Sequence, residues 1–189
     1  MTISAALLAG GESRRMGRDK ATIVFRERPL WQHQLETLRL VGPKQIFVSA
    51  RIDPVWRPPD VEFVSDEKPS RGPLSGIAAL LSRITTDHIL VLAIDVPFVT
   101  VDYLKKLHGQ IDTGRGVVPM IGTRAEPLVA IYPREAAADF QNALDHGELA
   151  LQRSVRKLIE SGRLRRAPVG ADEISLFRNF NEPQDVERD

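Results

Sequence analysis

The sequence predicts an α/β domain with three layers, in which helices cover both faces of a mostly parallel sheet. Short apolar runs typical of strands alternate along the chain with longer amphipathic runs typical of helices, which is the pattern of βαβ units. No internal repeat and no change in composition marks a linker, so we expect a single domain over residues 1–189. A domain of this size buries enough surface to fold without a disulfide or a structural metal.

The first part of the chain supplies a strand, a helix and two further strands. Residues 3–8 form an apolar run that predicts a buried first strand. Residues 30–41 carry apolar side chains near helical spacing and follow Pro29, which indicates a helix with a proline at its start. The next two strands are expected at residues 45–49 and 61–65, on either side of a proline-rich loop.

The second part of the chain continues the alternation. Residues 75–84 are expected to form a helix, and the apolar run 89–94 is expected to form the following strand. Thr100 is a good N-cap for a helix that ends near Gly109. The remaining expected elements are two short strands at 117–120 and 128–131 and two helices at 134–144 and 149–160.

Composition and charge exclude several classes of protein. The absence of cysteine excludes disulfides, thiolate metal sites and a cysteine nucleophile. With 26 basic and 25 acidic side chains the net charge is +1, so the whole molecule is not steered toward nucleic acid. No apolar run approaches the roughly 20 residues that a membrane-spanning helix needs, and the N-terminus lacks the basic start of a signal peptide. We therefore expect a cytoplasmic protein that binds neither membranes nor nucleic acid.

A segment rich in glycine and arginine carries the strongest functional signal. It follows the first predicted strand, at the carboxyl edge where open α/β sheets bind ligands. Its glycines allow backbone N–H groups to face an anion, and its cations can offset the charge of a triphosphate. It has neither the spacing of a Walker loop nor a G-x-G-x-x-G fingerprint, and a solvated basic loop is the alternative. The segment reads Leu8-Ala9-Gly10-Gly11-Glu12-Ser13-Arg14-Arg15-Met16-Gly17-Arg18-Asp19-Lys20.

This segment resembles the signature of the molybdenum cofactor guanylyltransferases, L-A-G-G-x-S-x-R-M-G-x-D-K, at every defined position. Further blocks resemble the family in the expected order along nearly the whole chain. The resemblance implies a Rossmann-like nucleotidyltransferase fold and a magnesium-dependent transfer of GMP from GTP to the terminal phosphate of molybdopterin, with release of pyrophosphate. The further blocks are Pro29-Leu30-Trp31-Gln32-His33, Arg71-Gly72-Pro73-Leu74-Ser75-Gly76, Asp95-Val96-Pro97, Glu126-Pro127-Leu128-Val129-Ala130 and Asn179-Phe180-Asn181-Glu182-Pro183.

Asp95 is the expected ligand of the metal. It ends an apolar run, so its carboxylate should project from the carboxyl edge of the sheet. Mg²⁺ takes one or two carboxylates together with phosphate oxygens, and Asp95 can supply one of them. An aspartate shortly before Pro97 can equally shape a turn. The resemblance implies that Asp95 binds both the metal and the nucleotide, and acts in catalysis.

The resemblance also implies roles for other polar residues. Lys20 is expected to contact the nucleotide phosphates and to act in catalysis together with Arg15, although surface cations of this kind are usually solvated. Asp66 is expected to bind the nucleotide, with the capping of a strand end as its alternative role. Asn179 and Asn181 alternate on an extended segment, point the same way, and are expected to bind the acceptor substrate. Further nucleotide contacts are implied for Leu8, Ala9, Gly10 and Gly11.

The implied chemistry needs no general base. The attacking group is a phosphate monoester, which is already anionic because its second pKa lies near ~6. The difficulty is to bring two anions together, so catalysis consists of charge neutralisation and alignment. Lys20, Arg15 and Mg²⁺ on Asp95 would provide both. The histidines show no ligand spacing, and structural or exposed positions are expected for His33, His88, His108 and His146.

Three alternatives stay open. A CTP-dependent molybdopterin cytidylyltransferase typically shows L-A-A-G, whereas Gly10 and Gly11 here leave more room for a purine and favour GTP. A sugar-1-phosphate nucleotidyltransferase is a more distant rival, and a non-catalytic nucleotide-binding relative would keep the fold without turnover. Ser49 stands where some family members carry a nucleotide-contacting asparagine. The implied partners are GTP and molybdopterin, with transient contacts to cofactor-biosynthesis proteins and acceptor molybdoenzymes, which no residue identifies.

Overall fold

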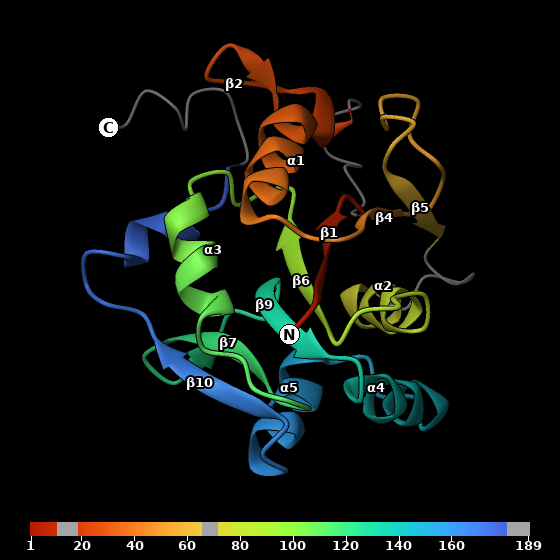
Figure 1. The fold of residues 1–189 in the computed structure, drawn as a ribbon, viewed down its shortest axis with the longest axis vertical. Coiled ribbons are helices and arrows are strands. Elements are labelled where there is room, and N and C mark those ends of the chain that lie inside the picture. The colour runs from red at the N-terminus through yellow and green to blue at the C-terminus, as the bar shows by residue number, and fades with distance from the viewer. Residues whose placement is uncertain (11–18, 66–71, 181–189) are drawn as a thin grey trace.

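A central sheet with helices on both of its faces organises the molecule (Figure 1). The computed structural model describes residues 1–10, 19–65 and 72–180. In this part of the chain the sheet has eight strands, in the order β10-β7-β9-β6-β1-β4-β5, with β8 paired to β7. The strands are β1 (Ile3–Leu8), β4 (Ile46–Ala50), β5 (Glu62–Ser65), β6 (His88–Ala93), β7 (Gly116–Ile121), β8 (Arg124–Ala125), β9 (Val129–Pro133) and β10 (Leu164–Pro168).

The strand directions confirm a mostly parallel sheet. β1 is parallel to both of its neighbours, β4 and β6, and β4 is parallel to β5. On the other side, β9 runs antiparallel to β6 and β7, while β10 is parallel to β7. Because β9 is reversed, its first residues lie beside the last residues of β6.

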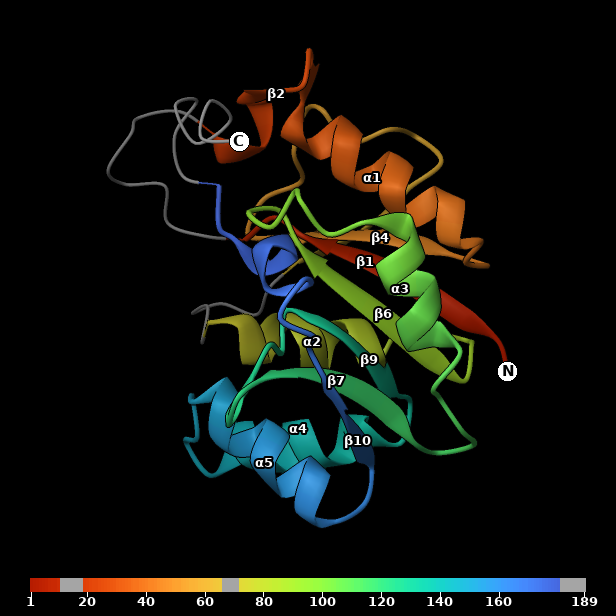
Figure 2. The ribbon, with the colours of Figure 1, turned by 90° about the vertical axis from the view of Figure 1, so that its left-hand side faces the viewer.

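The helices form the outer layers. α1 and α3 cover one face of the sheet, and α2, α4 and α5 cover the other, which confirms the predicted three-layer α/β class (Figure 2). The helices are α1 (Leu30–Val41), α2 (Pro73–Leu81), α3 (Val101–His108), α4 (Ala136–Asp145) and α5 (Leu151–Glu160), joined by two 3-10 turns, η1 (Lys20–Thr22) and η2 (Ile174–Phe177), and by a small hairpin of β2 (Val24–Phe25) and β3 (Arg28–Pro29).

The core is divided by the sheet into two clusters, and β1 contributes to both. Successive side chains of a strand point to opposite faces. Ile3, Ala5 and Leu7 therefore pack in the cluster beneath α1 and α3. Ala6 and Leu8 pack in the cluster beneath α2, α4 and α5. A strand that is covered on both faces reads as a continuous apolar run, which is why this element could be predicted from the sequence.

Most helix boundaries follow from local chemistry. α1 ends at Val41 and is capped by Gly42, whose φ of 82° is the left-handed conformation that glycine adopts at low cost. The Thr100 side chain caps α3 by accepting a hydrogen bond from the Tyr103 N–H at 3.2 Å, as predicted. The helix expected at residues 75–84 spans Pro73–Leu81 instead. Pro73 can begin it because the first position of a helix does not need an N–H donor.

Four strands were missed by the sequence prediction: β8, β10 and the two strands of the β2–β3 hairpin. β10 lies at an edge of the sheet, and its Arg165 side chain forms an ion pair with Asp112 at 2.6 Å. Arginine and proline in a strand are typical of a protected edge, and they remove the apolar pattern. The hairpin turns through Arg26 and Glu27, both with positive φ, where Asn or Gly would have given a recognisable signal.

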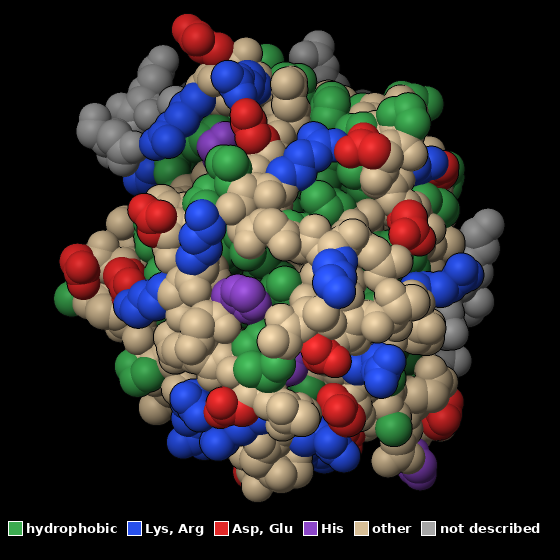
Figure 3. All heavy atoms as spheres, viewed as in Figure 1, with side chains coloured by type: hydrophobic (Ala, Val, Ile, Leu, Met, Phe, Trp, Pro, Cys, Tyr) green, Lys and Arg blue, Asp and Glu red, His purple; other side chains and the backbone are tan. Residues whose placement is uncertain are grey.

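The surface carries both signs of charge. Figure 3 shows basic and acidic side chains interspersed over one face of the molecule, in keeping with the net charge of +1. Within the described ranges, none of the helices combines the length and the apolarity needed to cross a bilayer.

Candidate active site

The carboxyl edge of the sheet brings the sequence-predicted segments together. β1 and β6 are adjacent and parallel, and Leu8 lies opposite Ala93 in their register. Beyond the strands, the Ile94 N–H donates to the Leu8 carbonyl at 3.0 Å. Gly10 and Asp95 therefore leave the sheet at the same edge. In Figure 2 the strand β6 points to this edge, on the left of the view. This is the arrangement required if one ligand is to contact both segments.

Lys20 and Asp95 meet at this edge. The Lys20 Nζ lies 3.7 Å from the Asp95 Oδ2, and the two side chains keep 21% and 33% of their surface exposed. An ion pair at this separation and exposure contributes little to stability. The contact does place two accessible groups side by side. The Lys20 ammonium can bind phosphate oxygens, and the Asp95 carboxylate can bind a divalent cation.

A short turn positions Lys20. The Asp19 carboxylate caps η1, with its Oδ1 accepting from the Ala21 N–H at 3.0 Å. The Ile23 N–H donates to the Lys20 carbonyl at 3.2 Å and closes the turn. Ala21 is buried in the core beneath α1. The backbone of Lys20 is thus held by hydrogen bonds and packing, while its side chain extends toward Asp95.

Two side chains of α1 hold the backbone around Asp95. The fully buried Gln34 donates from Nε2 to the Ala93 carbonyl at 2.9 Å. The His33 Nε2 lies 3.0 Å from the Pro97 carbonyl, a contact in which the imidazole donates. Burial lowers the pKa of His33 below its ordinary value, although the hydrogen bond to Pro97 opposes this shift. His33 thus has the structural position expected of the histidines.

The C-terminal segment holds the carbonyl of Asp95 itself. The Phe180 N–H donates to this carbonyl at 2.8 Å. The Phe180 ring packs edge-on against Phe25 at a centroid distance of 5.4 Å, and Phe25 also contacts Phe98. Because Phe180 is fixed in this way, the exposed Asn179 next to it lies at the same edge of the sheet as Asp95.

The block that begins at Glu126 also reaches this edge. The Ala93 N–H donates to the Leu128 carbonyl at 2.9 Å, which places residues 126–128 beside the end of β6. The Tyr132 hydroxyl donates to the Pro127 carbonyl at 2.7 Å and stabilises the turn. Burial raises the pKa of the Glu126 carboxyl. No role was predicted for Glu126 from the sequence, although this residue opens one of the family blocks.

Several predicted residues cannot be placed in this geometry. Gly11, Arg15, Asp66 and Asn181 lie outside the described residues. Ser49 lies inside β4 with only 2% of its surface exposed, and its backbone carbonyl accepts from the Ala9 N–H at 2.9 Å. Ser49 therefore ties the start of the signature segment to the neighbouring strand.

The donor set around Asp95 fits a magnesium ion. Asp95 offers a partly exposed hard carboxylate, and the neighbouring Lys20 can bind phosphate oxygens of the same ligand. In the described part of the chain, no group of three or more His, Asp or Glu side chains gathers as a metal-binding cluster. A protein carboxylate that shares Mg²⁺ with substrate phosphates is the usual arrangement for this ion.

Comparison with known proteins identifies related chains. Residues 5–167 match the model of the MobA-like NTP transferase domain. A probable molybdenum cofactor guanylyltransferase from Opitutus terrae is 35% identical over 190 residues, covering 99% of this chain and 94% of the relative. A molybdenum cofactor guanylyltransferase from Syntrophotalea carbinolica is 31% identical over 98% of this chain and 89% of its own length.

A solved structure supports the same relationship. The crystal structure of molybdopterin-guanine dinucleotide biosynthesis protein A from Archaeoglobus fulgidus superimposes with a TM-score of 0.72 and 26% identity. The match covers 98% of this chain and 95% of that protein. The similarity thus extends over nearly the whole length of both chains.

Proposed function

This chain belongs to the MobA-like NTP transferase family and, within it, to the molybdenum cofactor guanylyltransferases, and we propose that it transfers GMP from GTP to the terminal phosphate of molybdopterin. The observation that carries the proposal is the meeting of Lys20 and Asp95 at the carboxyl edge, beside Gly10. The product is molybdopterin guanine dinucleotide, and pyrophosphate is released. In this proposal, residues 1–189 act as one nucleotidyltransferase domain.

The nucleotide lies, in this proposal, across the carboxyl ends of β1 and β6. Lys20 binds its phosphates. Arg15 adds a second positive charge, and the backbone N–H groups of the signature segment donate hydrogen bonds to the phosphate oxygens. Asp66 contributes a further contact to the nucleotide. The residues proposed to line this part of the site are Leu8, Ala9, Gly10 and Gly11.

Asp95 is the proposed ligand of Mg²⁺. When bound, the ion offsets negative charge on the phosphates and helps to align them. Asp95 is suited to this role because hydrogen bonds hold the backbone on both sides of it, while its carboxylate stays partly exposed. A ligand held in a fixed orientation loses less conformational entropy when the metal binds.

The transfer itself is an in-line displacement. A terminal phosphate oxygen of molybdopterin forms a bond to the α-phosphorus of GTP, and the bond from that phosphorus to the bridging oxygen breaks. The bonding electrons leave with pyrophosphate. The attacking oxygen is already anionic, so the residues around it neutralise charge and orient the two substrates.

The acceptor is proposed to lie on the side of Asn179 and Asn181. Asn179 is exposed, and it is linked to Asp95 through the Phe180 N–H. Amide side chains both donate and accept hydrogen bonds, so they can bind phosphate oxygens and metal-bound water. We also propose that the protein works in the cytoplasm and makes transient contacts with cofactor-biosynthesis proteins and acceptor molybdoenzymes.

A nucleotide screen tests the proposed function. The purified chain is incubated with molybdopterin, Mg²⁺ and one of GTP, CTP or ATP, and the product is identified by its mass. We expect the guanine dinucleotide with GTP. A cytosine dinucleotide in its place would replace this proposal with the cytidylyltransferase. Nucleotide binding without any product would identify a non-catalytic relative.

A further inference from the structure

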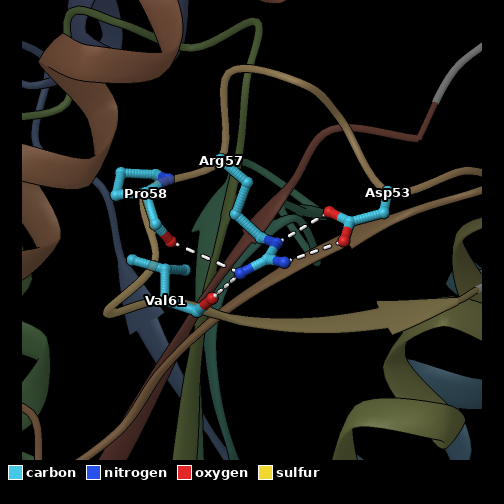
Figure 4. Close-up of polar contacts among 4 residues, drawn as sticks. All are labelled: Asp53, Arg57, Pro58 and Val61. Carbon is cyan, nitrogen blue, oxygen red and sulfur yellow. Dashed lines mark hydrogen bonds and ion pairs between the residues drawn. The ribbon is translucent and has the colours of Figure 1, made fainter.

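The loop between β4 and β5 is braced by Arg57. Its Nε and Nη2 donate to the two oxygens of Asp53, each at 2.7 Å (Figure 4). Its Nη1 donates to the carbonyl of Pro58 at 3.3 Å and also to that of Val61. A bidentate contact between a guanidinium and a carboxylate fixes both distance and orientation. The loop runs from the carboxyl end of β4 to the amino end of the parallel strand β5, and these contacts give it a defined shape although it contains no helix or strand.

The braced loop presents Trp56 to the signature segment. The Trp56 Nε1 donates to the Asp19 Oδ2 at 2.7 Å. The indole ring also stacks on Trp31 of α1, with a centroid distance of 5.5 Å and an angle of 15° between the planes. The stacking fixes the plane of the Trp56 ring, and the hydrogen bond fixes its direction within that plane.

Asp19 connects this tryptophan to the site. Its second oxygen, Oδ1, accepts from the Ala21 N–H and caps the turn that begins with Lys20. An ionised carboxylate is an acceptor at both oxygens, so one group can satisfy both donors at once. A continuous set of contacts thus runs from Trp56 through Asp19 to the turn that carries Lys20.

We propose that Trp56 is a positioning residue for Lys20 and acts through the Asp19 carboxylate. The inference rests on the proposed role of Lys20 in binding the triphosphate of GTP. With the indole N–H in place, the Asp19 side chain is held in the rotamer that caps η1. Without it, the carboxylate gains rotational freedom and the turn is held less firmly. Lys20 then loses more conformational entropy when it binds phosphate, and the affinity for GTP falls.

A packing role for Trp56 makes a different prediction. If only the aromatic surface mattered, phenylalanine would serve almost as well as tryptophan. Trp31 provides the matched control, because its ring takes part in the same stacking interaction, whereas the donor to Asp19 is Trp56. Comparing Trp56→Phe with Trp31→Phe therefore separates the N–H group from the ring.

The test measures GTP binding by calorimetry in the presence of Mg²⁺. Trp56→Phe should weaken binding by about fivefold, as expected for a lost hydrogen bond to a charged group that acts indirectly, and Trp31→Phe by less than about twofold. In the Asp19→Ala background, Trp56→Phe should cause no further loss, because the residue through which it acts is gone. Thermal unfolding of each variant shows that the folded state is retained.

The outcomes distinguish this inference from the proposed function. Unchanged binding by Trp56→Phe, equal losses for both tryptophans, or an additive effect in the Asp19→Ala background would each overturn the role of Trp56 while leaving GTP binding established. A wild-type chain that binds no GTP would contradict the proposed function itself, and with it the positioning role.

Discussion

The two edges of the sheet use polar side chains in opposite ways. At the amino edge, Ser4 and Thr86 are buried and hydrogen-bonded to each other at 2.8 Å, and Asp87 accepts two hydrogen bonds from Thr2. At the carboxyl edge, hydrogen bonds hold mainly the backbone, and the charged ends of Lys20 and Asp95 stay partly exposed. Open α/β sheets bind ligands at the carboxyl edge. The polar side chains at the amino edge therefore stabilise the fold, whereas those at the carboxyl edge are available to a substrate.

The largest expected effect on turnover comes from a substitution at the carboxyl edge. Asp95→Ala should lower turnover on the order of a hundredfold or more, because stabilisation of charge in the transition state is worth several kcal/mol. Its melting temperature should change little, since the exposed ion pair with Lys20 is weak. Turnover and thermal unfolding are measured on the same preparation. A large loss of stability with normal activity in the folded fraction would identify Asp95 as a turn-forming residue.

Gln34 should show a smaller effect on turnover. Gln34→Leu removes the donor to the Ala93 carbonyl and loosens the backbone before Asp95, so turnover should fall about fivefold to tenfold. Stability should fall only slightly, because the substitution also removes a buried amide oxygen that has no hydrogen-bond partner among the described residues. Gln32→Leu, on the exposed face of the same helix, is the matched control. Equal activity of the two variants would contradict a positioning role for Gln34.

A substitution at the amino edge should lower the stability of the protein and leave its turnover unchanged. Thr86→Val keeps the shape of the side chain but removes its hydrogen bonds to Ser4 and to the His88 carbonyl. Leaving buried polar groups without partners costs about 1–3 kcal/mol. Urea unfolding should therefore show a lower free energy of unfolding, while the turnover of the folded protein stays normal. A large loss of turnover would mean that the two edges are not independent.

The buried His88 and the half-buried His33 make stability depend on pH. Burial lowers the pKa of His88 and of His33 below the ordinary value of 6.5. Their imidazoles stay neutral in the folded protein at a pH where the unfolded chain already binds protons. Above about pH 7.5 the two histidines are neutral in both states and do not change the free energy of unfolding. As the pH drops through about 6.5, toward the lower pKa that the histidines have in the folded state, the free energy of unfolding falls.

Thermal unfolding at about pH 7.5 and about pH 5.5 measures this dependence. The melting temperature should be lower at the acidic pH, and His88→Gln should reduce the difference. The exposed His146→Gln is the control and should leave the difference unchanged. A melting temperature that is equal at both pH values would contradict a contribution of His88 and His33 to the pH dependence.

Much of the fold could be predicted because the pattern of each element is local. β1 and β6 are covered on both faces and read as apolar runs, and α1 carries apolar spacing between a proline and a glycine. β10 could not be predicted in the same way, because Arg165 and Arg166 replace the apolar pattern at the edge of the sheet.

The site could be predicted only in part, for a related reason. The segments containing Lys20 and Asp95 were evident because each follows an apolar strand and belongs to a family block. Gln34 and Trp56 were missed because their contacts join distant parts of the chain and leave no spacing to detect. Gln34 directly follows the block that ends at His33, which is the one sequence signal that could have drawn attention to it.

The most direct test of the central claim is a magnesium titration of Asp95→Asn. Asparagine keeps the size of the side chain and most of its hydrogen bonding but removes the charge that attracts the ion. GMP transfer by this variant should be much slower than wild type at low Mg²⁺ and should recover in part as the concentration rises, with an unchanged melting temperature. Normal transfer at the same Mg²⁺ concentrations as the wild type would contradict the assignment of Asp95 as the metal ligand.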